Sequence, residues 1–125
     1  LYRPQLVLRV SAASGESEQV FEPQELGRLP VRPETLSAIR EGLSGAANSP
    51  GGTAYQALKG MKVAGAGKTG TAENPDGDPH AWFAGYAPAD DPQIAVAVLV
   101  ENGGEGSQVA APLFRQVVEA FLKPE

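Results

Sequence analysis

The stretch VAGAGKTGTAENPDG, residues 63–77, places one lysine and two threonines inside a glycine-rich run. Lys68 carries a positive charge, and Thr69 and Thr71 carry hydroxyl groups close to it in sequence. Charged amines and hydroxyls are the groups that hold an anion, and glycine lets a ligand approach the backbone closely. Two kinds of site use such residues: a loop that cradles phosphate, and one wall of the active site of a serine enzyme.

The phosphate interpretation rests on residues 67–69, Gly-Lys-Thr, which match the end of a nucleotide-binding loop. That loop requires a glycine where this sequence has Lys62, and a helix that begins at the Lys-Thr pair. The following residues 70–77, GTAENPDG, are too rich in glycine, asparagine and proline for a helix. Glu101 could imitate a magnesium-binding residue, so a P-loop-like nucleotide-binding protein stays as the alternative.

An extended strand suits the second interpretation. Side chains two residues apart on a strand share a face, so Thr69 and Thr71 could present both hydroxyls to one substrate group. Lys68 would supply positive potential on a chain whose formal net charge is -5. Gly70 has no side chain, which lets a substrate backbone lie beside this segment as an added strand.

Lys68-Thr69-Gly70 is the third motif of the penicillin-binding protein and β-lactamase families, and the sequence segments around it extend the match. The chain resembles the C-terminal part of a class B penicillin-binding protein, a serine D,D-transpeptidase that cross-links peptidoglycan. The resemblance covers about residues 31–121, and the VENGG ending is most similar to the elongation type, penicillin-binding protein 2. The segments that carry it are GAANSPGGTA (45–54), AGKTGTAE (66–73), HAWFAGYAP (80–88) and IAVAVLVENGG (94–104).

The resemblance implies specific roles on peptides that end in D-Ala-D-Ala. Thr69, Gly70 and Thr71 would bind the substrate, the two hydroxyls holding its terminal carboxylate. Lys68 and Thr71 would be catalytic: the lysine helps to move protons, and the backbone N–H of Thr71 is one donor of the oxyanion hole. The resemblance also implies a nucleophilic serine, which β-lactams would acylate and so inhibit the enzyme. No metal or organic cofactor is needed.

The nucleophile motif of the family, Ser-x-x-Lys, is missing from this sequence, as is its Ser-x-Asn motif. We therefore expect the remainder of the transpeptidase domain, outside this chain, to carry the serine, and the 125 residues to be inactive alone. A non-catalytic peptidoglycan-binding module of the same fold stays as a further alternative. One strand motif does not separate a transpeptidase from a carboxypeptidase.

The resemblance also implies an extracytoplasmic protein that works with a membrane glycan polymerase. Its parent would be anchored by an N-terminal transmembrane helix that is not in this chain, since no apolar run approaches the roughly 20 residues that span a bilayer. The acidic composition, without a basic stripe, excludes a nucleic-acid partner. The absence of cysteine excludes disulfides and thiolate metal sites.

Hydrophobic patterning predicts an α+β fold, an antiparallel sheet packed by helices, as the C-terminal portion of one transpeptidase domain over residues 1–125. The expected parts are a hairpin and connector (1–30), a helical segment (31–60), a three-strand meander with the Lys-Thr-Gly motif (61–101) and a C-terminal helix (107–123).

Finer expectations concern the elements beside the motif. The apolar run 94–100 indicates a central strand covered on both faces, and the last helix should lie across the sheet. Thr53 is placed to cap a short helix, and residues 102–104, Asn-Gly-Gly, indicate a plain turn. His80 is the single histidine and is expected to be structural.

Overall fold

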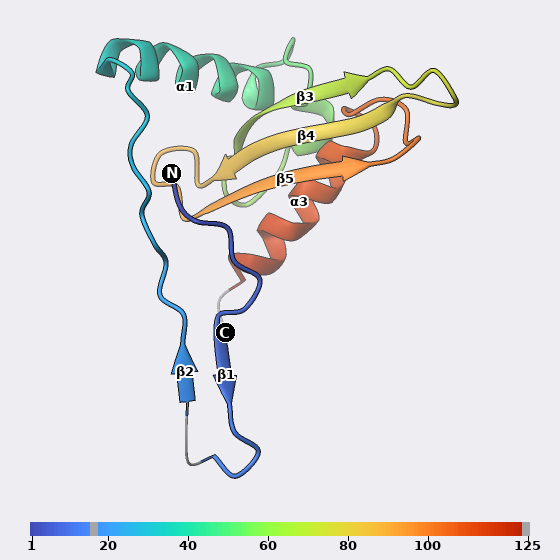
Figure 1. The fold of residues 1–125 in the computed structure, drawn as a ribbon. Coiled ribbons are helices and arrows are strands. Elements are labelled where there is room, and N and C mark those ends of the chain that lie inside the picture. The colour runs from blue at the N-terminus through green and yellow to red at the C-terminus, as the bar shows by residue number, and fades with distance from the viewer. Residues whose placement is uncertain (16–17, 124–125) are drawn as a thin grey trace. The chain divides into compact units, whose positions relative to one another are not determined.

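The computed structural model describes residues 1–15 and 18–123, and the chain divides into two compact units between Arg32 and Pro33 (Figure 1). The first unit contains strands β1 (Arg9–Ser11) and β2 (Glu18–Val20), which pair antiparallel as the sequence predicts. Part of the expected connecting loop, residues 16–17, lies outside the described residues. The strands are short and their side chains are exposed, so the described residues of this hairpin form no apolar core.

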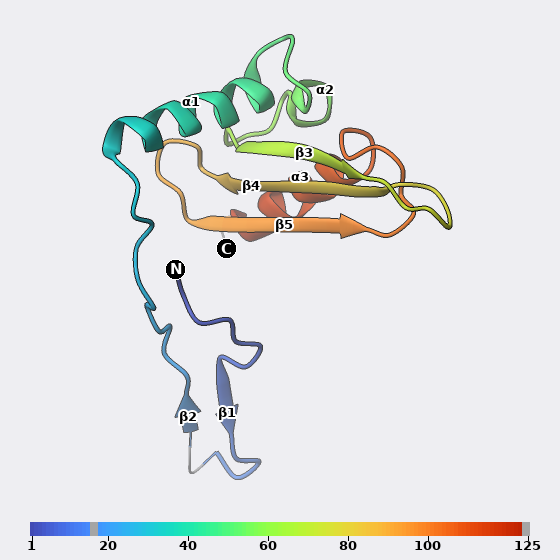
Figure 2. The same cartoon turned by 45° about the horizontal axis from the view of Figure 1, so that its top comes forward.

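The second unit holds a three-stranded antiparallel meander in the order β3-β4-β5, as the sequence predicts (Figure 2). Helix α1 lies beside β3, and helix α3 packs on β4 and β5. The elements are α1 (Pro33–Asn48), α2 (Tyr55–Leu58), β3 (Ala66–Ala72), β4 (His80–Ala87), β5 (Ile94–Val100) and α3 (Ala110–Phe121).

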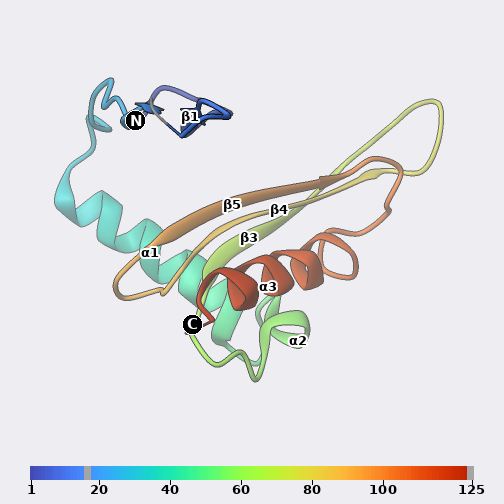
Figure 3. The ribbon, with the colours of Figure 1, turned by 90° about the horizontal axis from the view of Figure 1, so that it is seen from below.

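Helix α3 covers one face of the sheet (Figure 3), which confirms that the last helix lies across it. The expectation that residues 94–100 are covered on both faces is wrong for the part of the chain described. Burial alternates along β5: Val96 and Val98 face α3, whereas Ala97 is exposed. The run reads as continuously apolar because alanines and Leu99 occupy the open face, and β5 is an edge strand of this sheet.

Two phenylalanine rings form the centre of the core below β3. The ring centroids of Phe83 and Phe114 are 4.6 Å apart, and both side chains are fully buried. A Cβ atom placed at Gly67 would lie 2.6 Å from the Phe83 ring, and one at Gly85 would lie 2.8 Å from it. One at Gly65 would lie 3.2 Å from the Phe114 ring. These glycines are therefore explained by the space that the two rings occupy, without any phosphate.

In residues 1–15 and 18–123, no helix combines the length and the apolar character needed to cross a membrane.

The packing predicts a large effect of removing one ring. Phe114→Ala should lower the free energy of unfolding by about 3 to 5 kcal/mol, because it deletes a buried ring and leaves a cavity against Phe83. Urea denaturation of the intact protein measures this loss. Gln116→Ala, at an exposed position of the same helix, is the control and should change the stability by less than about 0.5 kcal/mol. Equal effects of the two changes would show that this ring pair is not central.

Candidate active site

The Lys-Thr-Gly motif lies within strand β3, not at the head of a helix. This geometry contradicts the nucleotide-binding alternative, which needs helical amide groups directed at a phosphate. Thr69 is paired with Phe83 and Thr71 with Ala81, so both threonines lie on the face of the sheet to which those buried residues belong. The predicted sharing of one face by the two threonines is therefore confirmed.

β3 is an edge strand, and β4 is its only strand partner among the described residues. Its first residues are buried, whereas Lys68, Thr71 and Ala72 are exposed and Thr69 and Gly70 are partly exposed. The strand therefore runs out of the core at the motif. An edge strand of this kind can accept an extended peptide through its unpaired backbone groups.

The amine of Lys68 folds onto the next residue. Its Nζ donates to the carbonyl oxygen of Thr69 at 2.7 Å and to the Thr69 hydroxyl at 3.1 Å. In the part of the chain that the structure describes, no carboxylate lies within ion-pair distance of this amine. The positive charge is therefore not neutralised by an acidic side chain, and an anionic ligand could complement it.

Thr53 joins the motif, which the sequence analysis did not foresee. The Thr69 hydroxyl donates to the Thr53 hydroxyl at 3.0 Å, which extends the polar group from the lysine through two threonines. The expected role of Thr53 as a helix cap is wrong, because the N-cap of α2 is Ala54 and it makes no side-chain cap bond. No local pattern reveals this contact, since 16 residues separate the two threonines.

The loop that carries Thr53 is held against the end of α1. The Ala54 N–H donates to the Ala46 carbonyl at 3.0 Å. A Cβ atom at Gly52 would overlap the carbonyl oxygens of Gly45 and Ala46, so only glycine fits this approach. The glycines of the PGGT sequence thereby bring Thr53 to the strand.

The start of β3 is also attached to α1. Asn48, the last residue of that helix, donates from Nδ2 to the Gly65 carbonyl at 2.9 Å and to the Ser44 carbonyl at 3.0 Å. This single amide group therefore connects the C-terminal end of the helix with the residue that precedes the strand. The contact fixes where β3 begins relative to α1.

The far end of β3 meets the segment between β5 and α3. Asn102 accepts at Oδ1 from Asn74 Nδ2 at 2.7 Å, and its N–H donates to Nδ1 of His80 at 3.0 Å. His80 is thus structural, as expected, because it completes the hydrogen bonds of a turn. Asn102 itself has φ of 52°, a left-handed conformation that asparagine tolerates better than most residues.

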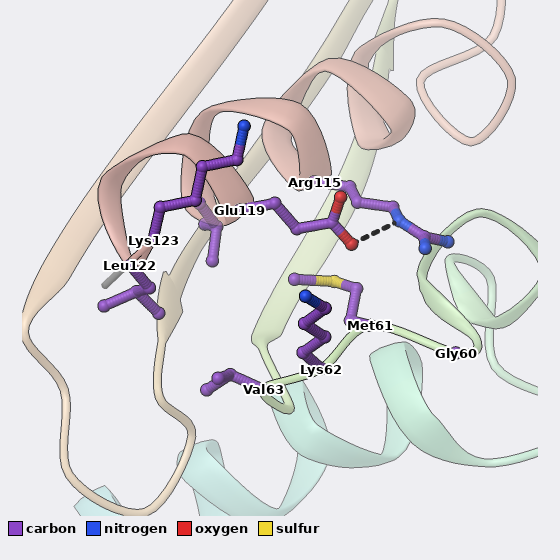
Figure 4. Close-up of a pocket in the computed structure, with 9 residues that line it drawn as sticks. Gly60, Met61, Lys62, Val63, Arg115, Glu119, Leu122 and Lys123 are labelled. Carbon is purple, nitrogen blue, oxygen red and sulfur yellow. Dashed lines mark hydrogen bonds and ion pairs between the residues drawn. The ribbon is translucent and has the colours of Figure 1, made fainter. Parts of the chain in front are cut away.

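A pocket beside α3 is separate from this motif (Figure 4). It lies between α3 and the connector 60–63, and none of residues 68–71 lines it. Figure 4 shows the Arg115 and Glu119 side chains paired at its margin, with Nε and Oε1 2.9 Å apart. Arg115 also donates to the Lys59 carbonyl at 3.1 Å. Its contacts therefore connect α3 with the segment leading from α2 to β3.

The geometry thus connects the Lys68 amine to the hydroxyls of Thr69 and Thr53 on an exposed strand edge, and Thr71 lies on the same face of the strand as Thr69. A carboxylate could accept hydrogen bonds from the hydroxyls while the amine balances its charge, which is stronger than binding by neutral groups alone. None of residues 1–15 and 18–123 forms the Ser-x-x-Lys motif that would supply an attacking serine next to this wall.

Comparisons with known proteins match most of the chain. The family model for the penicillin binding protein transpeptidase domain matches residues 1–119. The chain is 40% identical over 109 residues to the peptidoglycan D,D-transpeptidase PbpA of Mycobacterium tuberculosis, a match that covers 78% of this chain and 21% of that protein. It is 37% identical over 100 residues to MrdA, a peptidoglycan D,D-transpeptidase of Haemophilus influenzae, covering 68% of this chain and 15% of that protein.

A solved structure supports the same relationship. The penicillin G acyl-enzyme complex of penicillin-binding protein A from M. tuberculosis superimposes with a TM-score of 0.75 at 35% identity, covering 98% of this chain and 28% of that one. This chain spans about a fifth of the length of PbpA. It belongs to the penicillin-binding protein transpeptidase domain family, in its class B, penicillin-binding protein 2-like branch.

Proposed function

We propose that this chain is the C-terminal portion of the catalytic domain of a peptidoglycan D,D-transpeptidase, and that Lys68–Thr71 form one wall of the active site. The observation that carries the proposal is the hydrogen bond between the Lys68 amine and the Thr69 hydroxyl on an exposed edge strand, with no carboxylate partner for the lysine among the described residues. The proposed parts of the domain are a hairpin and connector (1–30), a helical segment (31–60), a three-strand meander with the Lys-Thr-Gly motif (61–101) and a C-terminal helix (107–123).

The proposed substrate is a stem peptide whose terminal carboxylate binds the hydroxyls of Thr69 and Thr71. Without substrate, the Thr69 hydroxyl donates its hydrogen to Thr53 and accepts from the Lys68 amine. On binding, the Thr69 hydroxyl would turn its hydrogen to the carboxylate, and the Thr53 hydroxyl could donate to the Thr69 oxygen in return. Gly70 adds no side chain in the path of the peptide backbone, and a Cβ atom there would lie 3.2 Å from Trp82 Cβ. The substrate can therefore extend along the free edge of β3.

The proposed reaction is acyl transfer through a serine in the remainder of the domain. The serine oxygen loses its proton and attacks the penultimate D-Ala carbonyl, which forms the ester of the acyl-enzyme and breaks the C–N bond to the last residue. The leaving amine takes up a proton, and D-Ala is released. An amine of a neighbouring stem peptide then attacks the acyl group and restores the serine. Thr71 N–H stabilises the oxyanion of both steps, and Lys68 assists proton transfer. The penicillin G acyl-enzyme of the M. tuberculosis relative supports this chemistry.

The proposed setting is the outer side of the cytoplasmic membrane. There the parent protein would be anchored by an N-terminal helix and would work beside a membrane glycan polymerase. The mechanism needs no metal and no organic cofactor, because a serine nucleophile, a lysine and hydrogen-bond donors are sufficient for acyl transfer.

The proposal predicts where covalent labelling occurs. The isolated 125-residue chain should form no stable adduct with a fluorescent penicillin, because it has no Ser-x-x-Lys serine. The intact protein should form one adduct, detected by in-gel fluorescence and located by peptide mass spectrometry outside these residues. Labelling of the isolated chain would overturn the division of the site. An intact protein that binds stem peptides without acylating would indicate a non-catalytic module.

Removing the lysine should slow acylation. In the intact protein, Lys68→Ala should reduce the second-order rate constant for acylation by penicillin by about 10²-fold or more, because a positioned proton-transfer group contributes that much. Stopped-flow fluorescence measures the rate. Lys62→Ala removes an equal charge from the exposed connector before β3 and should leave the rate within about twofold. A similar loss in both variants would mean that net charge alone matters.

Removing one hydroxyl should weaken recognition of the carboxylate. Thr71→Val keeps the shape of the side chain and should lower the acylation rate constant for penicillin by about tenfold or more, since a hydrogen bond to a charged group contributes about 1.5 to 3 kcal/mol. With the methyl ester of penicillin, which lacks the carboxylate, the wild type and the variant should react at nearly equal rates. Thr35→Val, exposed on α1, is the control and should behave as wild type with both compounds.

A further inference from the structure

The segment 101–109, which connects β5 to α3, lies against the motif end of β3. Gly106 in this segment is buried, and a Cβ atom placed on it would overlap the carbonyl oxygens of Gly70 and Trp82. The same atom would lie 3.1 Å from the Gly70 nitrogen. Gly106 therefore packs directly on the backbone of the Lys-Thr-Gly motif and on its partner in β4, where no other residue type fits.

The conformation of the turn does not explain this glycine. Asn102 and Gly104 have φ of 52° and 78°, and these two residues make the left-handed steps that reverse the chain. Gly106 is not among the residues with positive φ, so its backbone conformation is open to other residues. Glycine is required at position 106 because the backbones of Gly70 and Trp82 lie too close to it for a side chain.

A second set of contacts holds the loop that follows β3. Asn102 accepts the hydrogen bond of Asn74 at 2.7 Å, and the Gly104 N–H donates to the Pro79 carbonyl at 2.8 Å. The backbone N–H of Asn102 is bound by His80 at 3.0 Å, at the start of β4. The loop 73–79 is thus attached to the segment 101–109 near both of its ends.

These contacts matter because β3 has no strand on its outer side among the described residues. The last residues of an edge strand are held by one ladder of hydrogen bonds, which permits fraying. A donor of an oxyanion hole, in contrast, must hold its position within about 0.5 Å. The packing of Gly106 below Gly70 and the Asn74–Asn102 hydrogen bond beyond Ala72 restrain the motif from two directions.

We propose that Gly106 and Asn102 are positioning residues for the active site, which fix Gly70 and Thr71 in the place where they meet the carboxylate and the oxyanion. This inference rests on the proposed function. It assigns to the segment 101–109 a role that a plain connecting turn does not have.

The test uses acylation of the intact protein by penicillin and by its methyl ester. Gly106→Ala must push the segment 101–109 away from Gly70 and Trp82, because the added Cβ would overlap their carbonyl oxygens. The acylation rate constant for penicillin should fall by about 10²-fold, as expected for a shift of about 1 Å in a binding group. The loss with the ester should be clearly smaller, because the ester does not use the hydroxyls of Thr69 and Thr71. Gly42→Ala, at a position on α1 with no neighbouring atom within 4 Å of the added Cβ, is the control and should leave both rates unchanged.

A second pair of variants decides the matter if Gly106→Ala does not fold. Asn102→Gly keeps the left-handed backbone and removes the side-chain acceptor, whereas Asn74→Ala removes the donor of the same bond. Each should slow acylation by penicillin severalfold. The loss in the double variant should be clearly smaller than the product of the two single losses, since both changes break the Asn74–Asn102 bond. Asn74→Ala also removes the oxygen that accepts from the Asp76 N–H, so its loss alone can be the larger one. The loss should again be greater with penicillin than with the ester.

The outcomes separate this inference from the proposed function. If the wild type is acylated but the variants at positions 106, 102 and 74 react like it, the positioning role is wrong and the transpeptidase proposal stands. Equal losses with penicillin and its ester at an unchanged melting temperature would still support positioning of the Thr71 N–H, which both compounds use. Equal losses together with a lowered melting temperature would indicate general destabilisation and overturn the positioning role. A wild-type protein that forms no adduct would overturn the proposed function and this inference with it.

Discussion

The close packing of Phe83 and Phe114 below a glycine-rich strand is the constraint on which the rest of the unit depends. The rings come from β4 and α3, and they fill the space that side chains at Gly65, Gly67 and Gly85 would otherwise occupy. The helix can therefore approach the sheet closely, and β3 is fixed relative to both. A glycine-rich run that suggests a phosphate loop is, in this fold, a strand adapted to two aromatic rings.

The site is built by elements that are distant in sequence, each of which restrains a different part of β3. Asn48 holds the approach to the strand, Thr53 contacts its middle, and Gly106 packs below its last third. The exposed side chains of the motif thus stand on a backbone that is held from several directions. This arrangement agrees with the general need to place a binding group on rigid elements rather than on a free loop.

Local sequence pattern predicts the elements of this chain well because their periodicity is strong. Helix α1 lies within the predicted helical segment 31–60, and the meander is correct. Helix α3 lies within the predicted range 107–123 but begins three residues later and ends two residues earlier. The placement of Lys68–Thr71 on a strand also followed from the sequence, since the residues after them exclude a helix. Their roles in binding and catalysis stay predictions.

What the sequence does not reveal is tertiary contact. Thr53 reads as a cap because threonine often is one, yet its partner lies 16 residues away. Asn102 reads as a turn residue, and its side chain meets Asn74 across 28 residues. The run in β5 reads as doubly covered because alanine and leucine are apolar wherever they lie. Whether a face of a strand is buried depends on which other elements pack on it, and the sequence of the strand alone does not show this.

The glycines under and beside β3 also limit how such a protein can change over evolutionary time. At positions 67, 85 and 106 even one added methyl group collides with a ring or with the main chain. Any substitution of these glycines would therefore disturb the fold, whether or not the residue contributes to activity. Exposed positions such as Ala72 and Ala84 have no such restriction. Within this unit, substitutions can therefore accumulate at the open surface of the strands, whereas positions 67, 85 and 106 must stay glycine.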